Sequence, residues 1–132
     1  MNIQKLLDVR GTKYAYLGMA MIANMVWAVL FMSAIDWILA NYATLVSGID
    51  VSMMLGMFLG ALAITFGMSQ FANDGRGVTY GIYGGLADMV VVVILTFSSG
   101  LLAALVGLAT LLGGFNGGTL GEGFRRARRK MP

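Results

Sequence analysis

One acidic residue, Asp88, lies near the middle of a long apolar stretch, residues 80–97, that is typical of a membrane-spanning helix. A carboxylate at the centre of a span disfavours membrane insertion by roughly 2.5–3.5 kcal/mol, so we expect it to have a compensating role. Two interpretations stay open. Asp88 either joins helices as a protonated hydrogen-bonding group, or it is a proton or cation site, because intramembrane acids often mark ion pathways.

Three further polar residues, Asn24, Thr65 and Thr110, lie one in each of the other predicted spans. Counted at about 1.5 Å per residue from the aromatic residues at the span ends, Asp88 and Asn24 both lie ~12–15 Å inside. We therefore predict a polar layer across the bundle, in which Asn24 and the two threonines hydrogen-bond Asp88. The predicted spans contain no basic residue and no second acid, which favours the structural interpretation of Asp88.

Glycines recur at a spacing of four residues, as in Gly56 with Gly60 and Gly81 with Gly85. Small residues at that spacing give a helix a flat stripe along which a second helix can approach closely. Packing inside the bundle is the favoured interpretation, and association with other copies or subunits is the alternative. A third series, near the end of the last predicted span, is interpreted as part of a hinge: Gly113, Gly117 and Gly121.

Cysteine and histidine are both absent from the sequence. This excludes disulfides, thiolate metal sites, imidazole haem ligands and the Ser-His or Cys-His pairs of nucleophilic catalysis. Methionine pairs at helical spacing, such as Met53 with Met57, could bind Cu(I), but flexible core packing is the favoured interpretation. The sequence therefore predicts a protein that is not an enzyme and that has no cofactor or metal site.

The elements that position these residues follow from the composition. Of the 132 residues, 58% are hydrophobic and only 11% are charged, whereas about 25% are charged in an ordinary soluble domain. We predict an all-α integral membrane protein, a bundle of about four transmembrane helices in the cell (cytoplasmic or inner) membrane. Apolar runs of membrane-crossing length place the spans at about 14–35, 51–71, 80–97 and 101–115.

The segments between the spans have distinct patterns. Residues 1–13 and 36–49 are amphipathic and are predicted to be interfacial helices. The sequences NDGRGVT (73–79) and SSG (98–100) are predicted turns, because Asn, Asp and Gly tolerate the backbone of a tight reversal. Residues 116–132 are predicted to be a glycine-rich hinge followed by a basic cytoplasmic tail.

Basic residues are concentrated near both termini and in one loop. Lys5, Arg10 and Lys13 flank the first span, and Arg76 lies between the second and third spans. The positive-inside rule therefore predicts that both termini and the Arg76 loop are cytoplasmic. The tail is interpreted mainly as a topology signal that can also contact anionic lipid or a partner, and no nucleic acid is expected. Its basic residues are Arg125, Arg126, Arg128, Arg129 and Lys130.

Most of the predicted bundle is surface for helix packing, and we expect no soluble domain beside it. The sequence therefore favours a non-catalytic structural or accessory subunit of a larger membrane protein assembly, with other membrane subunits or copies of itself as partners. The alternative is a small homo-oligomeric proton or cation channel or transporter that uses Asp88.

Overall fold

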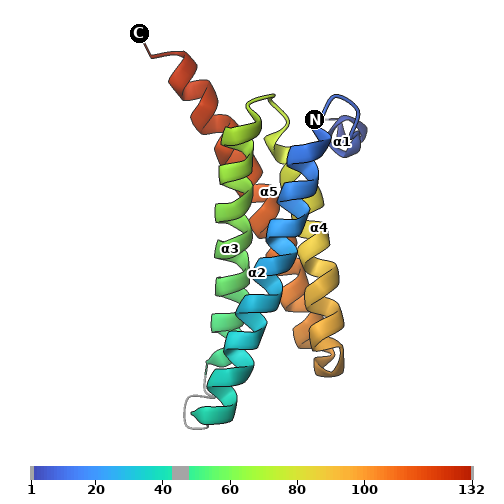
Figure 1. Cartoon of the computed structure of the whole chain (residues 1–132), viewed down its shortest axis with the longest axis vertical. Coiled ribbons are helices and arrows are strands. Elements are labelled where there is room, and N and C mark those ends of the chain that lie inside the picture. Colours follow the sequence, from blue (N-terminus) through green and yellow to red (C-terminus); the bar gives the residue numbers. More distant parts are fainter. Residues whose placement is uncertain (1, 43–47, 132) are drawn as a thin grey trace.

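The computed structural model describes residues 2–42 and 48–131, and within these ranges the chain is all-helical. Four helices are long and apolar enough to cross a membrane. They are α2 (Tyr14–Asn41), α3 (Ile49–Ala72), α4 (Gly77–Thr96) and α5 (Leu101–Arg129). A short helix, α1 (Ile3–Leu7), precedes them, and the 3₁₀ helix η2 (Phe97–Ser99) follows α4 (Figure 1).

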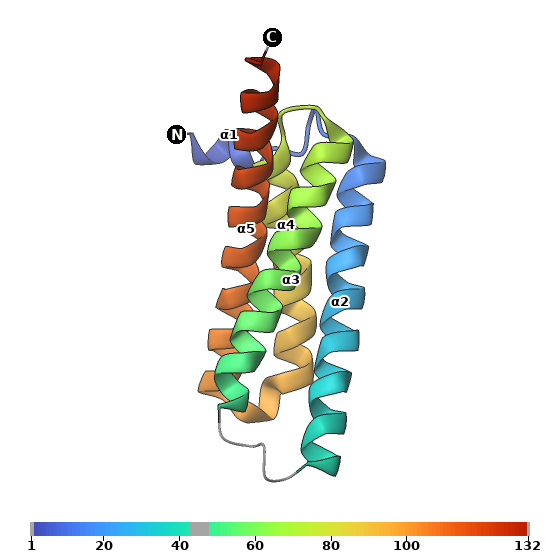
Figure 2. The ribbon, with the colours of Figure 1, turned by 90° about the vertical axis from the view of Figure 1, so that its left-hand side faces the viewer.

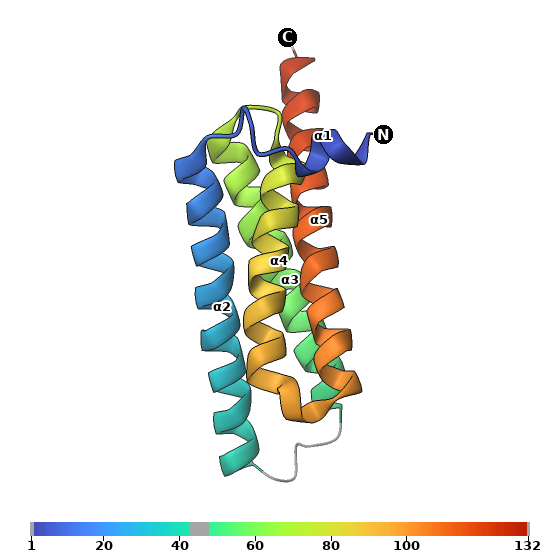
Figure 3. The same ribbon diagram turned by 90° about the vertical axis from the view of Figure 1, so that its right-hand side faces the viewer.

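The four long helices run alternately up and down the bundle. The two termini and the α3–α4 loop lie at one end, and the α4–α5 turn lies at the other (Figures 1 and 2). α3 and α4 each contact all three of the other long helices. α2 and α5 flank this central pair on opposite sides (Figure 3). We refer to the two ends as the terminal end and the distal end.

Buried apolar side chains form two clusters along the bundle. The cluster nearer the terminal end consists of Leu17, Ala20, Met68, Ala72 and Tyr80. The distal cluster consists of Ala28, Met32, Ile35, Met53, Met57, Val92 and Val106. Its methionines fill the core, as flexible thioether side chains do where the space between helices is irregular.

Both predicted turns are present. At the first reversal, Asn73 has a φ of 49° and Gly75 a φ of 77°, so Asn and Gly supply the left-handed backbone that the tight turn requires. At the second, η2 ends at Gly100, whose φ is 59°. Turn chemistry is a local property, and the sequence pattern was therefore sufficient to find both.

The end of the first span differs from the prediction. α2 does not stop at Ile35 but continues to Asn41 as one helix, so the predicted separate interfacial helix at 36–49 is wrong over its first part. No Gly or Pro interrupts this stretch, and the Asn41 side-chain amide donates to the Trp37 carbonyl at 2.8 Å, which supports the last turn. Residues 43–47 of the predicted interfacial helix lie outside the described residues.

The predicted hinge is also wrong, because α5 stays helical far beyond residue 115 and ends only at Arg129. Glycine disfavours a helix by about 1 kcal/mol relative to Ala, which motivated the hinge prediction. In the bundle, however, Gly114 and Gly118 pack against the backbone of α4, and Gly121 packs against Ser69 of α3. Close contacts that only glycine permits therefore hold this segment in a helix.

Candidate intramembrane site at Asp88

The side chain of Asp88 is fully buried on the face of α4 that looks into the bundle. The buried stripe of α4 runs from Gly81 through Gly84 and Gly85 to Asp88, and then to Val92. The glycines one turn before Asp88 leave room for neighbouring helices, since a Cβ on Gly85 would lie 3.2 Å from the Thr110 carbonyl oxygen. The carboxyl group therefore lies between the two apolar clusters of the core.

Asn24 of α2 lies next to this stripe and is fully buried. Its amide nitrogen packs against Gly84, where a Cβ would approach it to 2.7 Å. The same nitrogen donates to the Ala20 carbonyl of its own helix at 2.7 Å. The amide oxygen of Asn24 has no hydrogen-bond partner among the described residues.

The two threonines of the predicted polar layer are fully buried, and their hydroxyl groups bond to backbone carbonyls. Thr65 contacts the Ala61 carbonyl at 2.8 Å and the Gly114 carbonyl at 3.0 Å, so it connects α3 to α5. Thr110 donates to the Gly107 carbonyl of its own helix at 2.7 Å. Such back-bonding to the preceding turn is a usual choice for threonine inside a helix.

Asp88 therefore lacks the hydrogen bonds predicted from Asn24 and the threonines. Within residues 2–42 and 48–131, neither carboxyl oxygen of Asp88 has a partner. The four polar residues are all fully buried, and Asn24 and Thr65 both lie beside Gly84 of α4. Their donor groups, however, bond to backbone carbonyls. Three unpartnered acceptor oxygens remain, two on Asp88 and one on Asn24. Chemically, the carboxyl group of such a site can bind a proton, or the oxygens can coordinate a cation.

A second polar cluster lies at the terminal end, and sequence reasoning missed it. The Tyr80 hydroxyl donates to an Asp74 carboxylate oxygen at 2.5 Å and accepts a bond from the Lys13 backbone amide at 2.8 Å. The Lys13 ammonium group donates to the Ala72 carbonyl at 2.8 Å. We call Lys13, Asp74 and Tyr80 the Tyr80 cluster. It ties the starts of α2 and α4 to the end of α3.

Charged residues at the same end also hold α1 and α5 in place. The Arg76 guanidinium group donates to the Asp8 carbonyl at 3.1 Å, and the Tyr83 hydroxyl donates to the Leu7 carbonyl at 2.6 Å. On the α5 side, one Glu122 carboxylate oxygen accepts a hydrogen bond from the Val78 backbone amide at 3.1 Å, and the other pairs with Arg126 at 3.5 Å. These side chains connect segments that are far apart in the sequence.

The predicted basic tail forms the end of α5 rather than a flexible extension. Arg125, Arg128 and Arg129 line a groove between α5 and the end of α3. Arg126 points to Glu122 instead, and Lys130 caps the helix and is exposed. The basic residues of the tail are thus divided between two faces of α5.

The predicted packing glycines lie at two helix interfaces within the chain. Gly56 and Gly60 of α3 lie beside the rings of Phe31 and Trp27 of α2, respectively. Gly81 and Gly85 of α4 lie against the backbone of α5. The α4–α5 contacts are between backbones, whereas the α2–α3 contacts are between backbone and aromatic rings.

Comparison of the chain with protein-family models, with curated proteins and with solved structures finds no match.

Proposed function

We propose that this chain is a non-catalytic structural or accessory subunit of a larger membrane protein assembly, and that it works through helix–helix packing. The observation that carries the proposal is a pair of apolar grooves on either side of α2. Both run along the outer surface of the bundle at the depth of the apolar spans. We call them the α2–α4 groove and the α2–α3 groove.

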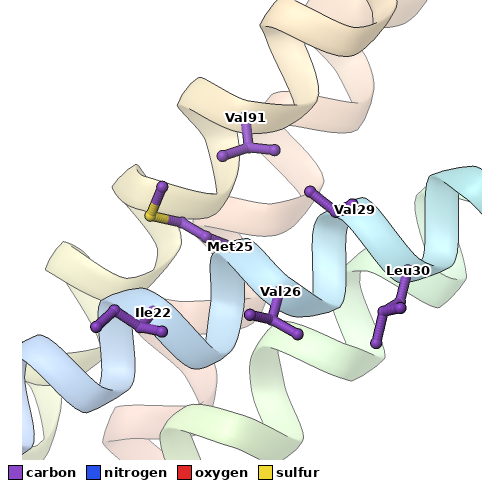
Figure 4. Close-up of a pocket in the computed structure, with 6 residues that line it drawn as sticks. All are labelled: Ile22, Met25, Val26, Val29, Leu30 and Val91. Carbon is purple, nitrogen blue, oxygen red and sulfur yellow. The ribbon is translucent and has the colours of Figure 1, made fainter.

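The grooves are lined by apolar residues alone. The α2–α4 groove has a volume of about 350 Å³, and Figure 4 shows its lining: Ile22, Met25, Val26, Val29, Leu30 and Val91. The α2–α3 groove has a volume of about 500 Å³ and is lined by Trp27, Phe31, Gly56, Leu59, Gly60, Ala63 and Ile64.

The floor of the α2–α3 groove suits a transmembrane helix of another subunit. The rings of Phe31 and Trp27 cover Gly56 and Gly60 only in part, since both glycines are half-buried, and Ala63 is exposed. Small residues therefore remain partly open on the outer face of α3. In lipid, helices gain free energy from close packing rather than from the hydrophobic effect, and stripes of small residues allow that close approach. A partner helix seated there would bury the small residues that the aromatic rings of α2 leave open.

Filling the groove without disturbing the bundle tests this proposal. Ala63→Phe adds a ring on the exposed face of α3, and Ala104→Phe adds the same ring on an exposed face of α5 outside both grooves. A photo-crosslinking residue at Leu59 would report the neighbour of the groove in native membranes. We expect a discrete crosslinked partner and a large native size in mild detergent, both lost in Ala63→Phe and kept in Ala104→Phe. Equal behaviour of the two variants would refute the proposal.

Orientation and the lipid contact of the tail belong to the same proposal. The concentration of basic residues at the terminal end supports a cytoplasmic location for both termini and for the Arg76 loop. At that end, the basic residues of α5 would face the anionic inner leaflet, where each contributes ~1 kcal/mol of attraction.

A second candidate function rests on the unpartnered oxygens of Asp88 and Asn24. A small homo-oligomeric proton or cation channel or transporter could use them as its ion site, since intramembrane acids often mark ion pathways. Ion flux into proteoliposomes, measured across a pH range for the wild type and for Asp88→Asn, tests this function. Flux that depends on Asp88, from a closed ring of identical chains, would support it. If the well-folded wild type shows no flux, the channel function is ruled out and the structural or accessory function remains.

A further inference from the structure

A basic groove at the terminal end is separate from the apolar grooves that flank α2. It has a volume of about 310 Å³ and lies between the last turn of α3 and the last turns of α5. Its lining is entirely polar or basic: Gln70, Asn73, Arg125, Arg128 and Arg129. We call it the arginine groove.

Two hydrogen bonds hold the groove in shape. The Arg125 guanidinium group donates to the Asn73 side-chain oxygen at 3.0 Å, and the Gln70 amide nitrogen donates to the Gly121 carbonyl at 2.6 Å. Asn73 is itself fixed, because it adopts the left-handed conformation that ends α3. The guanidinium group of Arg125 is therefore positioned before any ligand binds, which lowers the entropy cost of binding.

The charge of the groove is not neutralised by the protein. Among the described residues, the one ion pair joins Arg126 to Glu122, and no carboxylate lines the groove. Arginines near a helix C-terminus are favourable by themselves, because they interact with the negative end of the helix dipole. The helix dipole alone does not explain why three guanidinium groups surround one cavity. The planar, forked donors of a guanidinium group match the oxygens of a phosphate.

An aromatic pair lies directly beside the arginines. Arg128 lies over the ring of Phe124, with 4.7 Å between the guanidinium carbon and the ring centroid. The Phe124 ring in turn packs against the ring of Phe66 of α3, with 6.0 Å between the two ring centroids. Phe71, near the end of α3, is 71% exposed. Tyrosines and basic residues are typical of the membrane–water interface, and the exposed Tyr14 at the start of α2 lies at the same end of the bundle as the arginines. This would place the arginine groove at headgroup depth.

We infer that the arginine groove binds the phosphate of an anionic phospholipid, with the acyl chains lying along the Phe66–Phe124 pair. The inference rests on the proposed contact between the tail and anionic lipid. The inference goes beyond that proposal in two ways. It assigns the lipid contact to one face of α5, and it includes the uncharged residue Asn73, which positions Arg125.

The test uses the purified protein in neutral detergent, titrated with phosphatidylglycerol or phosphatidylcholine, with bound lipids counted by native mass spectrometry. Arg128→Gln removes one charge from the groove, and Arg126→Gln removes the same charge from the other face. We expect about a tenfold or larger loss of phosphatidylglycerol affinity in Arg128→Gln, the size expected for one charge-assisted hydrogen bond. Arg126→Gln should lose about twofold at most, because Arg126 lies outside the groove and pairs with Glu122, so it would attract the lipid only by screened long-range charge.

Asn73→Gly provides a test without any change of charge. Glycine keeps the left-handed turn but removes the oxygen that positions Arg125, so the affinity for phosphatidylglycerol should fall several-fold while thermal stability stays close to that of the wild type. Phosphatidylcholine should bind weakly to every variant.

Three outcomes would overturn the inference. Equal losses in Arg126→Gln and Arg128→Gln would mean that the tail attracts anionic lipid only by its total charge. No loss in either variant would remove the lipid contact altogether. Competition by soluble glycerol phosphate at the same concentration as the lipid would mean that the groove binds a soluble phosphate compound and that the acyl chains contribute nothing.

Discussion

Gly81 of α4 and Gly114 of α5 contact each other through their backbones, and a Cβ on either residue would overlap the carbonyl oxygen of the other. The contact is repeated one turn away, where Gly118 meets Gly77. The two helices therefore approach to a distance that only glycine allows. In a membrane, such close approach yields dispersion contacts and weak Cα–H···O bonds that lipid cannot replace.

Alanine substitutions should separate this interface from glycines that have no such role. Gly114→Ala forces α4 and α5 apart and should destabilise the fold by about 1–3 kcal/mol, the usual cost of overpacking. Gly67 and Gly123 have open space where a Cβ would lie. Alanine at either should be neutral or stabilise by about 0.5–1 kcal/mol, because it favours the helix. Unfolding of the purified protein in detergent measures the difference, and similar effects at all three positions would contradict the structure.

Asp88 should be dispensable for folding. Leucine has the same branching as aspartate and leaves no unpartnered polar atom, so Asp88→Leu should be neutral or stabilise the bundle by about 1 kcal/mol. Asp88→Asn keeps a polar group and should have little effect. Thermal unfolding of the three proteins in detergent provides the comparison. A clear loss of stability in Asp88→Leu would mean that Asp88 does bond to other helices. A stable Leu variant that fails in cells would point to a functional role.

The Tyr80 cluster should contribute to the stability of the terminal end. Tyr80→Phe keeps the buried ring but removes the bonds to Asp74 and Lys13, so we expect a loss of about 1–3 kcal/mol. Tyr83→Phe removes one exposed bond to the Leu7 carbonyl and serves as the matched control, with a smaller loss. Unfolding measurements give the two values, and the opposite ranking would show that the cluster has no stabilising role.

Labelling from outside the cell tests the orientation. The chain has no cysteine, so single cysteines report cleanly. Cysteines at Asn41 and Ser99 should react with an impermeant reagent added outside, and a cysteine at Arg76 should react only after the membrane is opened. Labelling of Asn41 and Arg76 from the same side would contradict the four-span arrangement.

The sequence by itself determined the features that depend on local chemistry. Hydropathy and length predict four membrane-spanning helices, and the Asn and Gly residues around Asn73 and Gly100 predict the turns that reverse the chain. The position of Asp88 inside the third apolar span, about two turns after Tyr80, also follows from the sequence. Each of these depends only on neighbouring residues and on the dimensions of the bilayer.

Tertiary structure decided the rest, because contacts between helices depend on which faces meet. Taken without the rest of the fold, the glycines after Phe115 predict a hinge. In the bundle, backbone contacts with α4 keep this segment helical. The threonines could have bonded Asp88, but Thr110 donates to its own helix and Thr65 reaches a carbonyl of α5. A hydroxyl proton goes to the acceptor that lies nearest in space. For that reason, only the packed bundle could reveal that Asp88 is buried without a hydrogen-bond partner among the residues that the structure describes.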